Sequence, residues 1–269
     1  MPAADSNASS GFAAHDELKR RFGYDRGIVR TFTVFDGRPV LEGEHLIIEE
    51  SVLEVGEPRT AAVGTGRDWR IDVTTRSPDG ELLRVERWDM FGYSSGSPRA
   101  ERARTATDGE RSASTDVPVL LESFTLTPEL VRARAAANDV WVAVHHDTAA
   151  AVAAGARDIF LDTISQITMF RERAGALVDD EHRLVSVALT MRSPICAGDQ
   201  VELVLDDSDA SDDDAPDTPT SDPAGFIRRT ISLSARVGDR VHSRAEVLVV
   251  RTGPAGDHPR SIGLESLLP

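Results

Sequence analysis

The sequence predicts an α+β protein that contains two antiparallel sheets, of which only the second encloses a helix. The main observation is a repeat, since residues 39–44 return as 194–199 with a proline at the start and a glycine before an acidic residue at the end. Each copy is followed by alternating apolar and polar residues, which is the pattern of a half-buried strand. Strong helical patterns lie mainly between the two copies, so the two units differ in their helices.

The N-terminal unit contains one short helix and four strands. The helix is predicted over 12–22, and the strands at 28–35, 45–55, 69–76 and 82–91. Pro78, Asp79 and Gly80 form the turn of the last hairpin, because such residues favour the backbone angles of tight turns. Too few residues precede Arg38 for three helices and their loops, so this unit is expected to lack a central helix.

The C-terminal unit begins with three predicted helices. Thr127 suits the N-cap of the first, Pro128 its first position and Glu129 the positive end of the helix dipole. This helix is predicted to extend to about Asn138, a second over 148–154 to end at Gly155, and a third to occupy 162–174 with apolar residues at helical spacing. Strands are predicted at 184–191, 200–205, 227–236 and 241–251.

These elements divide the chain into a tail with a short helix (1–27), an incomplete N-terminal unit (28–93), a linker (94–120), a complete C-terminal unit (121–253) and a C-terminal tail (254–269). An acidic insertion at 206–223 interrupts the C-terminal unit. It lacks the glycine and closing glutamate of a calcium-binding loop, so a solvated, disordered segment is expected there.

Composition limits the function classes. The net charge of −15 disfavours nucleic acid and anionic membranes as partners. No apolar stretch is long enough to span a bilayer, and the N-terminus does not have the pattern of a signal peptide. The single cysteine, Cys196, suits a reducing compartment, and a cytoplasmic protein is expected.

The C-terminal unit resembles the MaoC-like acyl dehydratases, also called R-specific enoyl hydratases. The likeness rests on 124–131, 144–147, the alanine-rich helix before Gly155 and 192–199. Residues 28–93 resemble the sheet of the partner unit in double-hotdog members of that family. The resemblance implies a double hotdog with a complete central helix in the C-terminal unit only. It also implies that the incomplete first half leaves room for a bulky acyl group.

The resemblance further implies an acyl thioester of coenzyme A or an acyl carrier protein as substrate, with water added or removed at a 2,3-enoyl group. This chemistry needs a base for water, an acid for the α-carbon and donors for the thioester oxyanion. The family uses an aspartate, a histidine five residues later and amides at the start of the central helix. No metal or other cofactor is implied. A homodimer is expected, or a heteromer with another hotdog subunit.

The matching histidine is His145, which is either functional or structural, and the position five residues earlier is Val140. Either an insertion of one residue allows Asp139 to reach the site, or the pair is broken. Asp162 stands where the family has a glycine at the start of the central helix. It is either a relocated acid or base, or the N-cap of that helix.

The other site predictions concern substrate contacts. The amides near Thr163 are expected to hold the thioester carbonyl, and Trp141 and His146 are candidate substrate contacts, with a core position as the alternative for Trp141. Two other functions stay open. One is a retasked hotdog lyase, isomerase or cyclase that uses Asp162 as its acid or base. The other is a non-catalytic hotdog subunit that pairs with an active partner.

Overall fold

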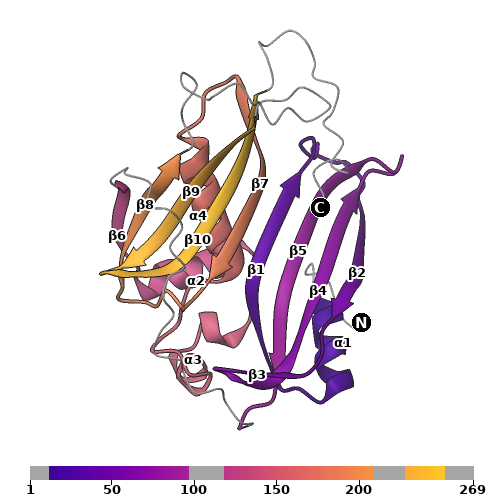
Figure 1. Ribbon diagram of the computed structural model, residues 1–269, viewed down its shortest axis with the longest axis vertical. Coiled ribbons are helices and arrows are strands. Elements are labelled where there is room, and N and C mark those ends of the chain that lie inside the picture. The colour runs from indigo at the N-terminus through magenta and orange to yellow at the C-terminus, as the bar shows by residue number, and fades with distance from the viewer. Residues whose placement is uncertain (1–11, 97–117, 209–227, 252–269) are drawn as a thin grey trace.

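The computed structural model describes residues 12–96, 118–208 and 228–251 (Figure 1). The tails 1–11 and 254–269, most of the predicted linker and most of the predicted acidic insertion lie outside these ranges. The helices are α1 (Phe12–Phe22), α2 (Pro128–Ala137), the 3-10 turn η1 (Ala143–His145), α3 (Thr148–Ala153) and α4 (Thr163–Gly175). The strands are β1 (Arg26–Asp36), β2 (Ile47–Val55), β3 (Arg59–Ala61), β4 (Gly64–Arg76), β5 (Leu82–Tyr93), β6 (Val119–Thr125), β7 (His182–Met191), β8 (Gln200–Ser208), β9 (Arg228–Val237) and β10 (Arg240–Arg251).

Every helix and strand expected from the sequence is present within the described ranges, with small differences at the ends. The Thr127 hydroxyl accepts a hydrogen bond from the Leu130 N–H, which confirms the predicted N-cap of α2. Three short elements escaped prediction, namely β3, η1 and β6. Strand β6 begins at Val119, within the segment predicted to be a linker, and pairs with β8.

The ten strands form one continuous antiparallel sheet, so the prediction of two separate sheets is wrong. The strand order is β2-β4-β5-β1 in one half and β7-β10-β9-β8-β6 in the other. Strands β1 and β7 meet at the centre, where Phe32 of β1 pairs with Leu189 of β7. Both side chains are buried. The pairing satisfies the backbone groups of what would otherwise be two exposed edges, which favours one sheet over two.

The repeated segment is a turn that a carboxylate closes in the same way in both halves. Glu44 accepts a hydrogen bond from the Leu41 N–H at 2.9 Å, and Asp199 accepts one from the Cys196 N–H at 2.7 Å. The glycine before each carboxylate has a positive φ, +79° at Gly43 and +87° at Gly198, which an L side chain rarely adopts. The sequence repeat is therefore a structural device, used once before β2 and once before β8.

Strand β8 extends to Ser208, and so includes the first three residues of the segment predicted to be an acidic insertion. Asp206 belongs to the sheet because Arg236 of β9 pairs with its carboxylate at 2.6 Å and Ser234 donates to it at 2.9 Å. These partners compensate the negative charge, so the first acidic residues of the run remain in a strand.

Helix α4 packs against β7, β9 and β10 (Figure 1). It contributes Ile167, Met169, Phe170 and Ala174 to the hydrophobic core. In the N-terminal half the same face of the sheet contacts α1, whose Leu18 is buried in the core cluster together with Trp69 of β4. Among the described residues, no helix has the length and apolar character that crossing a membrane requires.

Candidate active site

The start of α4 is held in place by the strand region beside it. Phe160 forms an isolated bridge with Cys196, the Leu161 N–H donates to the Ile195 carbonyl at 3.0 Å, and the Ala197 N–H donates to the Ile159 carbonyl at 2.8 Å. These contacts tie residues 159–161 to the repeated turn before β8. The N-terminus of α4 therefore has a defined position relative to the sheet.

Asp162 caps this helix. It is 3% exposed, and its Oδ1 accepts a hydrogen bond from the Ser165 N–H at 2.8 Å while its other oxygen accepts one from the Ser165 hydroxyl. The N–H groups of Thr163 and Ile164 donate to no group within the described ranges. Such first-turn amides, at the positive end of a helix dipole, can stabilise a developing negative charge.

Asn138, the C-cap of α2, reaches the same helix start. Its side-chain amide donates to the Ser165 hydroxyl oxygen at 2.9 Å and lies 3.5 Å from Asp162 Oδ1. The sequence did not predict Asn138 as a residue of the site and indicated its neighbour Asp139 instead. The available signal was the predicted end of α2 at Asn138, because a side chain at a helix end can turn toward the next element.

His145 lies on η1, with its ring 9% exposed. Its Nδ1 is 2.8 Å from the carbonyl oxygen of Phe160, and its ring meets the Phe160 ring edge-on at a centroid distance of 4.9 Å. A carbonyl oxygen only accepts, so Nδ1 carries the proton and Nε2 has the lone pair. In the described part of the chain, no hydrogen bond engages Nε2.

The pKa of His145 lies below its ordinary 6.5 because burial disfavours the imidazolium ion. The hydrogen bond to Phe160 and the negative charge of Asp162 oppose this lowering, and His146 adds to it. The lowered pKa favours the neutral imidazole at neutral pH. Asp162 lies close enough for its negative charge to act on the pKa of His145. A neutral imidazole with a vacant Nε2 can accept a proton.

Asp139, Trp141 and His146 form a second, more exposed cluster. Asp139 has a φ of +55°, and its Oδ1 accepts a hydrogen bond from the Trp141 indole at 2.5 Å. The Trp141 ring is 65% exposed and stacks on His146, which contacts the Val140 carbonyl through Nε2 at 2.7 Å. Trp141 thus lies on the surface, which excludes the core position considered for it.

The structure thus brings His145 and Asp162 to the start of α4 and directs the Asp139 carboxylate to Trp141 instead. Asp139 adopts a left-handed backbone conformation, which short polar residues tolerate, and this turn precedes the site by several residues. A direct pairing of Asp139 with His145 is not formed in this arrangement.

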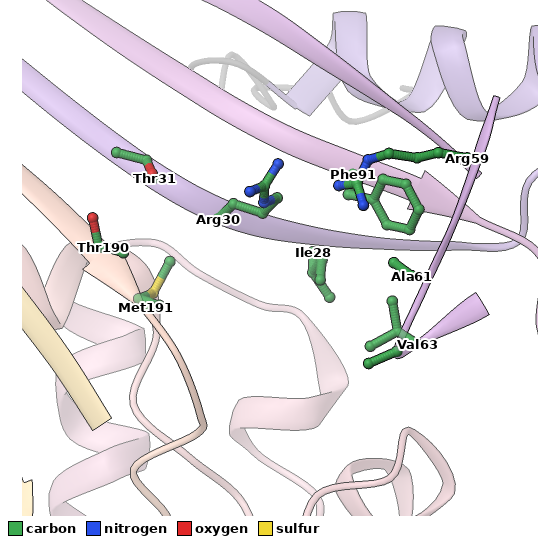
Figure 2. Close-up of a pocket in the computed structure, with 10 residues that line it drawn as sticks. Ile28, Arg30, Thr31, Arg59, Ala61, Val63, Phe91, Thr190 and Met191 are labelled. Atoms are coloured by element: carbon green, nitrogen blue, oxygen red, sulfur yellow. The ribbon is translucent and has the colours of Figure 1, made fainter. Parts of the chain in front are cut away.

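A cavity of about 310 Å³ lies beside this site, lined by residues of the N-terminal half of the sheet and of the end of β7. Met191 joins the two regions, because it lines the cavity and its sulfur lies 3.7 Å from the Thr163 hydroxyl and 3.6 Å from the Gln166 amide nitrogen. Figure 2 shows Met191 and Thr190 at one side of the cavity and Arg59 with Phe91 at the other. The lining includes Ile28, Arg30, Thr31, Arg59, Phe91 and Met191.

No protein-family model matches the amino-acid sequence, and no curated protein matches it either. The fold does match solved structures. A MaoC-like dehydratase superposes with a TM-score of 0.61 at 13% identity, over 90% of this chain and 83% of that chain. HtdX from Mycobacterium tuberculosis gives a TM-score of 0.54 at 14% identity, over 86% of this chain and 82% of that one.

A putative oleoyl thioesterase from Lactobacillus plantarum also superposes, with a TM-score of 0.50 at 13% identity over 88% of this chain and 80% of that chain. A MaoC-like dehydratase, HtdX and a putative oleoyl thioesterase thus share one fold with this protein. At such low identity the likeness shows the fold alone, which is the hotdog fold, and the reaction must be argued from the site.

Proposed function

We propose that the protein is a double-hotdog enzyme that acts on acyl thioesters and adds water to, or removes it from, a 2,3-enoyl group. The observation that carries the proposal is the buried His145, whose Nδ1 contacts the Phe160 carbonyl just before α4 and whose Nε2 has no hydrogen bond within the described ranges. The carrier would be coenzyme A or an acyl carrier protein, and the acyl chain would extend toward the cavity beyond Met191.

In the direction of hydration, Nε2 of His145 takes a proton from water as the water oxygen bonds to C3 of the enoyl group. The electron pair of the double bond moves toward the thioester carbonyl, whose oxyanion accepts hydrogen bonds from the Thr163 and Ile164 amides. The imidazolium then gives a proton to C2, and the net result is the addition of one water molecule. Dehydration follows the same path in reverse.

Asp162 supports this role through its charge, which stabilises the imidazolium as it forms. A second candidate function assigns Asp162 a more direct part, in a retasked lyase, isomerase or cyclase. The observation in its favour is that Asp162, rather than Asp139, is the carboxylate near His145. Asp162→Asn keeps the helix cap and removes the charge. Loss of product by this folded variant would favour the second function if the wild-type protein converts another acyl thioester but hydrates no 2-enoyl thioester.

The test of the leading proposal is turnover of crotonyl thioester and longer 2-enoyl thioesters, measured by loss of enoyl absorbance. Replacement of His145 by Gln is expected to lower the rate by about 10²–10⁴-fold, the usual contribution of a general acid–base group. His182→Gln is the matched control, because His182 pairs with Asp179 at the surface and not with α4. Wild-type rates from His145→Gln, or no turnover by the wild-type protein, would contradict the proposal.

The partner predictions remain expectations. A homodimer is the leading one, and a heteromer in which this chain is a non-catalytic subunit is its alternative. Native mass and co-purification measure both, and activity of the isolated chain would remove the non-catalytic reading. A cytoplasmic location also remains a prediction.

A further inference from the structure

The cavity beside the site contains an unusual combination of charges for such an acidic protein. Its lining includes two arginines, Arg30 and Arg59, and otherwise consists of apolar residues and threonines. The chain as a whole has a net charge of −15, so two cations without a carboxylate in the lining are a local exception. Clefts lined by one sign of charge raise the local concentration of the opposite ion.

Both arginines share one carboxylate outside the lining. Arg30 Nη1 and Arg59 Nη2 each donate to Oδ1 of Asp68 at 2.8 Å, and Arg59 Nε donates to its other oxygen. One carboxylate compensates one of the two positive charges. A guanidinium has five N–H donors, so each arginine has donors beyond those that Asp68 uses. The cluster can therefore bind a further anion without losing its internal pairing.

The backbone positions both side chains. Arg30 is the extra residue where the register between β1 and β5 shifts, and such bulges redirect a side chain. Arg59 lies on β3, in a hairpin with β4 that presses closely on β5, since a Cβ on Gly66 would lie 1.9 Å from the Gly92 carbonyl oxygen. Arg59 consequently lies over the Phe91 ring at 4.5 Å (Figure 2).

The cavity also connects the two arginines with the start of α4, where the proposed reaction takes place. Met191 forms the opposite wall of the cavity and contacts Thr163 at the start of α4. A substrate whose thioester carbonyl bonds the first amides of α4 would therefore have one of its ends near the cavity. Between Met191 and the arginines the wall is mainly apolar, which suits an aliphatic segment that ends in an anion.

We propose that Arg30 and Arg59 bind an anionic group of the thioester substrate, an inference that rests on the proposed function. The shared chemistry is a carboxylate or phosphate oxygen that accepts N–H groups from both guanidinium planes. The anion has two sources, a carboxylate at the far end of the acyl chain or a phosphate of the carrier. The pocket thereby favours charged substrates over neutral ones of the same length.

The test is calorimetric binding of three saturated thioesters, which undergo no hydration. The neutral probe is butyryl-N-acetylcysteamine, the carboxylate probe is glutaryl-N-acetylcysteamine, and the phosphate probe is butyryl-CoA. At least one charged probe is expected to bind about tenfold more tightly than the neutral probe, the usual effect of a charge-assisted hydrogen bond. The identity of that probe gives the source of the anion. Equal affinity for all three overturns the proposal.

Variants of the arginines and of Asp68 are expected to change the affinity for the charged probe in opposite directions. Arg30→Gln and Arg59→Gln are each expected to weaken the favoured charged probe about tenfold and to leave the neutral probe unchanged. Asp68→Asn frees donors of both arginines and is expected to tighten the charged probe, a gain that misfolding does not produce. Arg20→Gln is the matched control, since Arg20 is an exposed residue of α1 that pairs with Glu17.

Equal weakening of neutral and charged probes by the arginine variants would overturn the inference, and so would unchanged or weaker binding of the charged probe to folded Asp68→Asn. The outcome is separable from that of the proposed function. A protein that binds the charged probe but hydrates no enoyl thioester supports the anion site and removes the hydratase proposal. A protein that hydrates enoyl thioesters without preference for charge removes the anion site alone.

Discussion

The strands β2-β4-β5-β1 and β8-β9-β10-β7 follow the same order in the two halves and share the same turn chemistry, yet the equivalent strands β2 and β8 differ greatly in burial. Ile48 of β2 and Leu203 of β8 each lie four residues after the carboxylate of the repeated turn. Ile48 is 52% exposed, whereas Leu203 is 1% exposed. In the C-terminal half α4 packs against the sheet and contributes to the core cluster, and β6 pairs with β8 and packs Leu121 and Phe124 against that cluster.

This difference teaches that the turn and the strand are local properties, whereas burial depends on the layer that covers them. Every residue of β2 is exposed although all of them except Leu53 pair with residues of β4. The half that contains α4 also contains the buried residues His145 and Asp162. The start of that helix provides first-turn amides in a buried environment, which the N-terminal half does not have in the described ranges. The other half contributes the wall of the cavity instead.

The largest expected effect comes from truncating these two equivalent side chains. Leu203→Ala is expected to lower the free energy of unfolding by about 2–5 kcal/mol, because it leaves a void in the core. Ile48→Ala is expected to cost less than about 0.5 kcal/mol, as exposed positions usually do. Denaturant unfolding of both variants measures the difference. Comparable losses would show that β2 is covered in solution, for example by a second copy of the chain.

The next effect concerns a buried histidine in the N-terminal half. His15 accepts a hydrogen bond from the Trp69 indole at 3.1 Å, and burial lowers its pKa from 6.5 to about 4. The folded state therefore keeps His15 neutral where the unfolded chain binds a proton. Its stabilising contribution is complete above pH 6.5 and is lost as the pH falls toward 4, a total of about 3 kcal/mol.

Unfolding in urea between about pH 7 and about pH 5.5 is expected to show a loss of about 1.4 kcal/mol from this group. His145 in the C-terminal half adds a loss of the same sign, because its pKa is also lowered. His15→Gln keeps an acceptor for Trp69 and removes the N-terminal part of the pH dependence. A variant with the full wild-type slope would show that His15 is not the group that titrates.

The smallest expected effect on the free energy of unfolding comes from replacing the glycine in each of the two repeated turns. Gly43→Ala and Gly198→Ala both place a side chain at a positive φ with no atom within 4 Å of the new Cβ. Each is therefore expected to cost only backbone strain, about 1 kcal/mol, and the two costs are expected to be equal. Thermal or denaturant unfolding compares them. Unequal costs would mean that one turn has a further contact that the repeat does not share.

Much of the fold was predictable from residues that act locally. Thr127 and Gly155 mark helix ends that the structure confirms, and the repeated turns precede β2 and β8 as expected. The join between the sheets was not predictable, because pairing of β1 with β7 connects residues far apart in the sequence. Periodicity reports the face of a strand and carries no information on which edge it pairs with.

The candidate site shows the same division. His145 was predicted as a candidate from its motif, and one of the two alternatives for Asp162 was the helix cap that the structure shows. Asn138 was not predicted to reach the start of α4. One left-handed residue, Asp139, decides which of the two adjacent side chains turns toward that helix. A single backbone angle of this kind depends on tertiary contacts and leaves little trace in the residue pattern.

By itself, the sequence determined the order and type of the elements, the two equivalent turns and the presence of a helix with a capping carboxylate in the second unit. These are consequences of hydrogen bonds and steric limits within a few residues. Only the tertiary structure decided that the halves share one sheet, that α4 lies against the C-terminal strands, and that Arg30 and Arg59 line a cavity one side chain away from that helix. Those outcomes depend on long-range pairing and on burial, which no local pattern encodes.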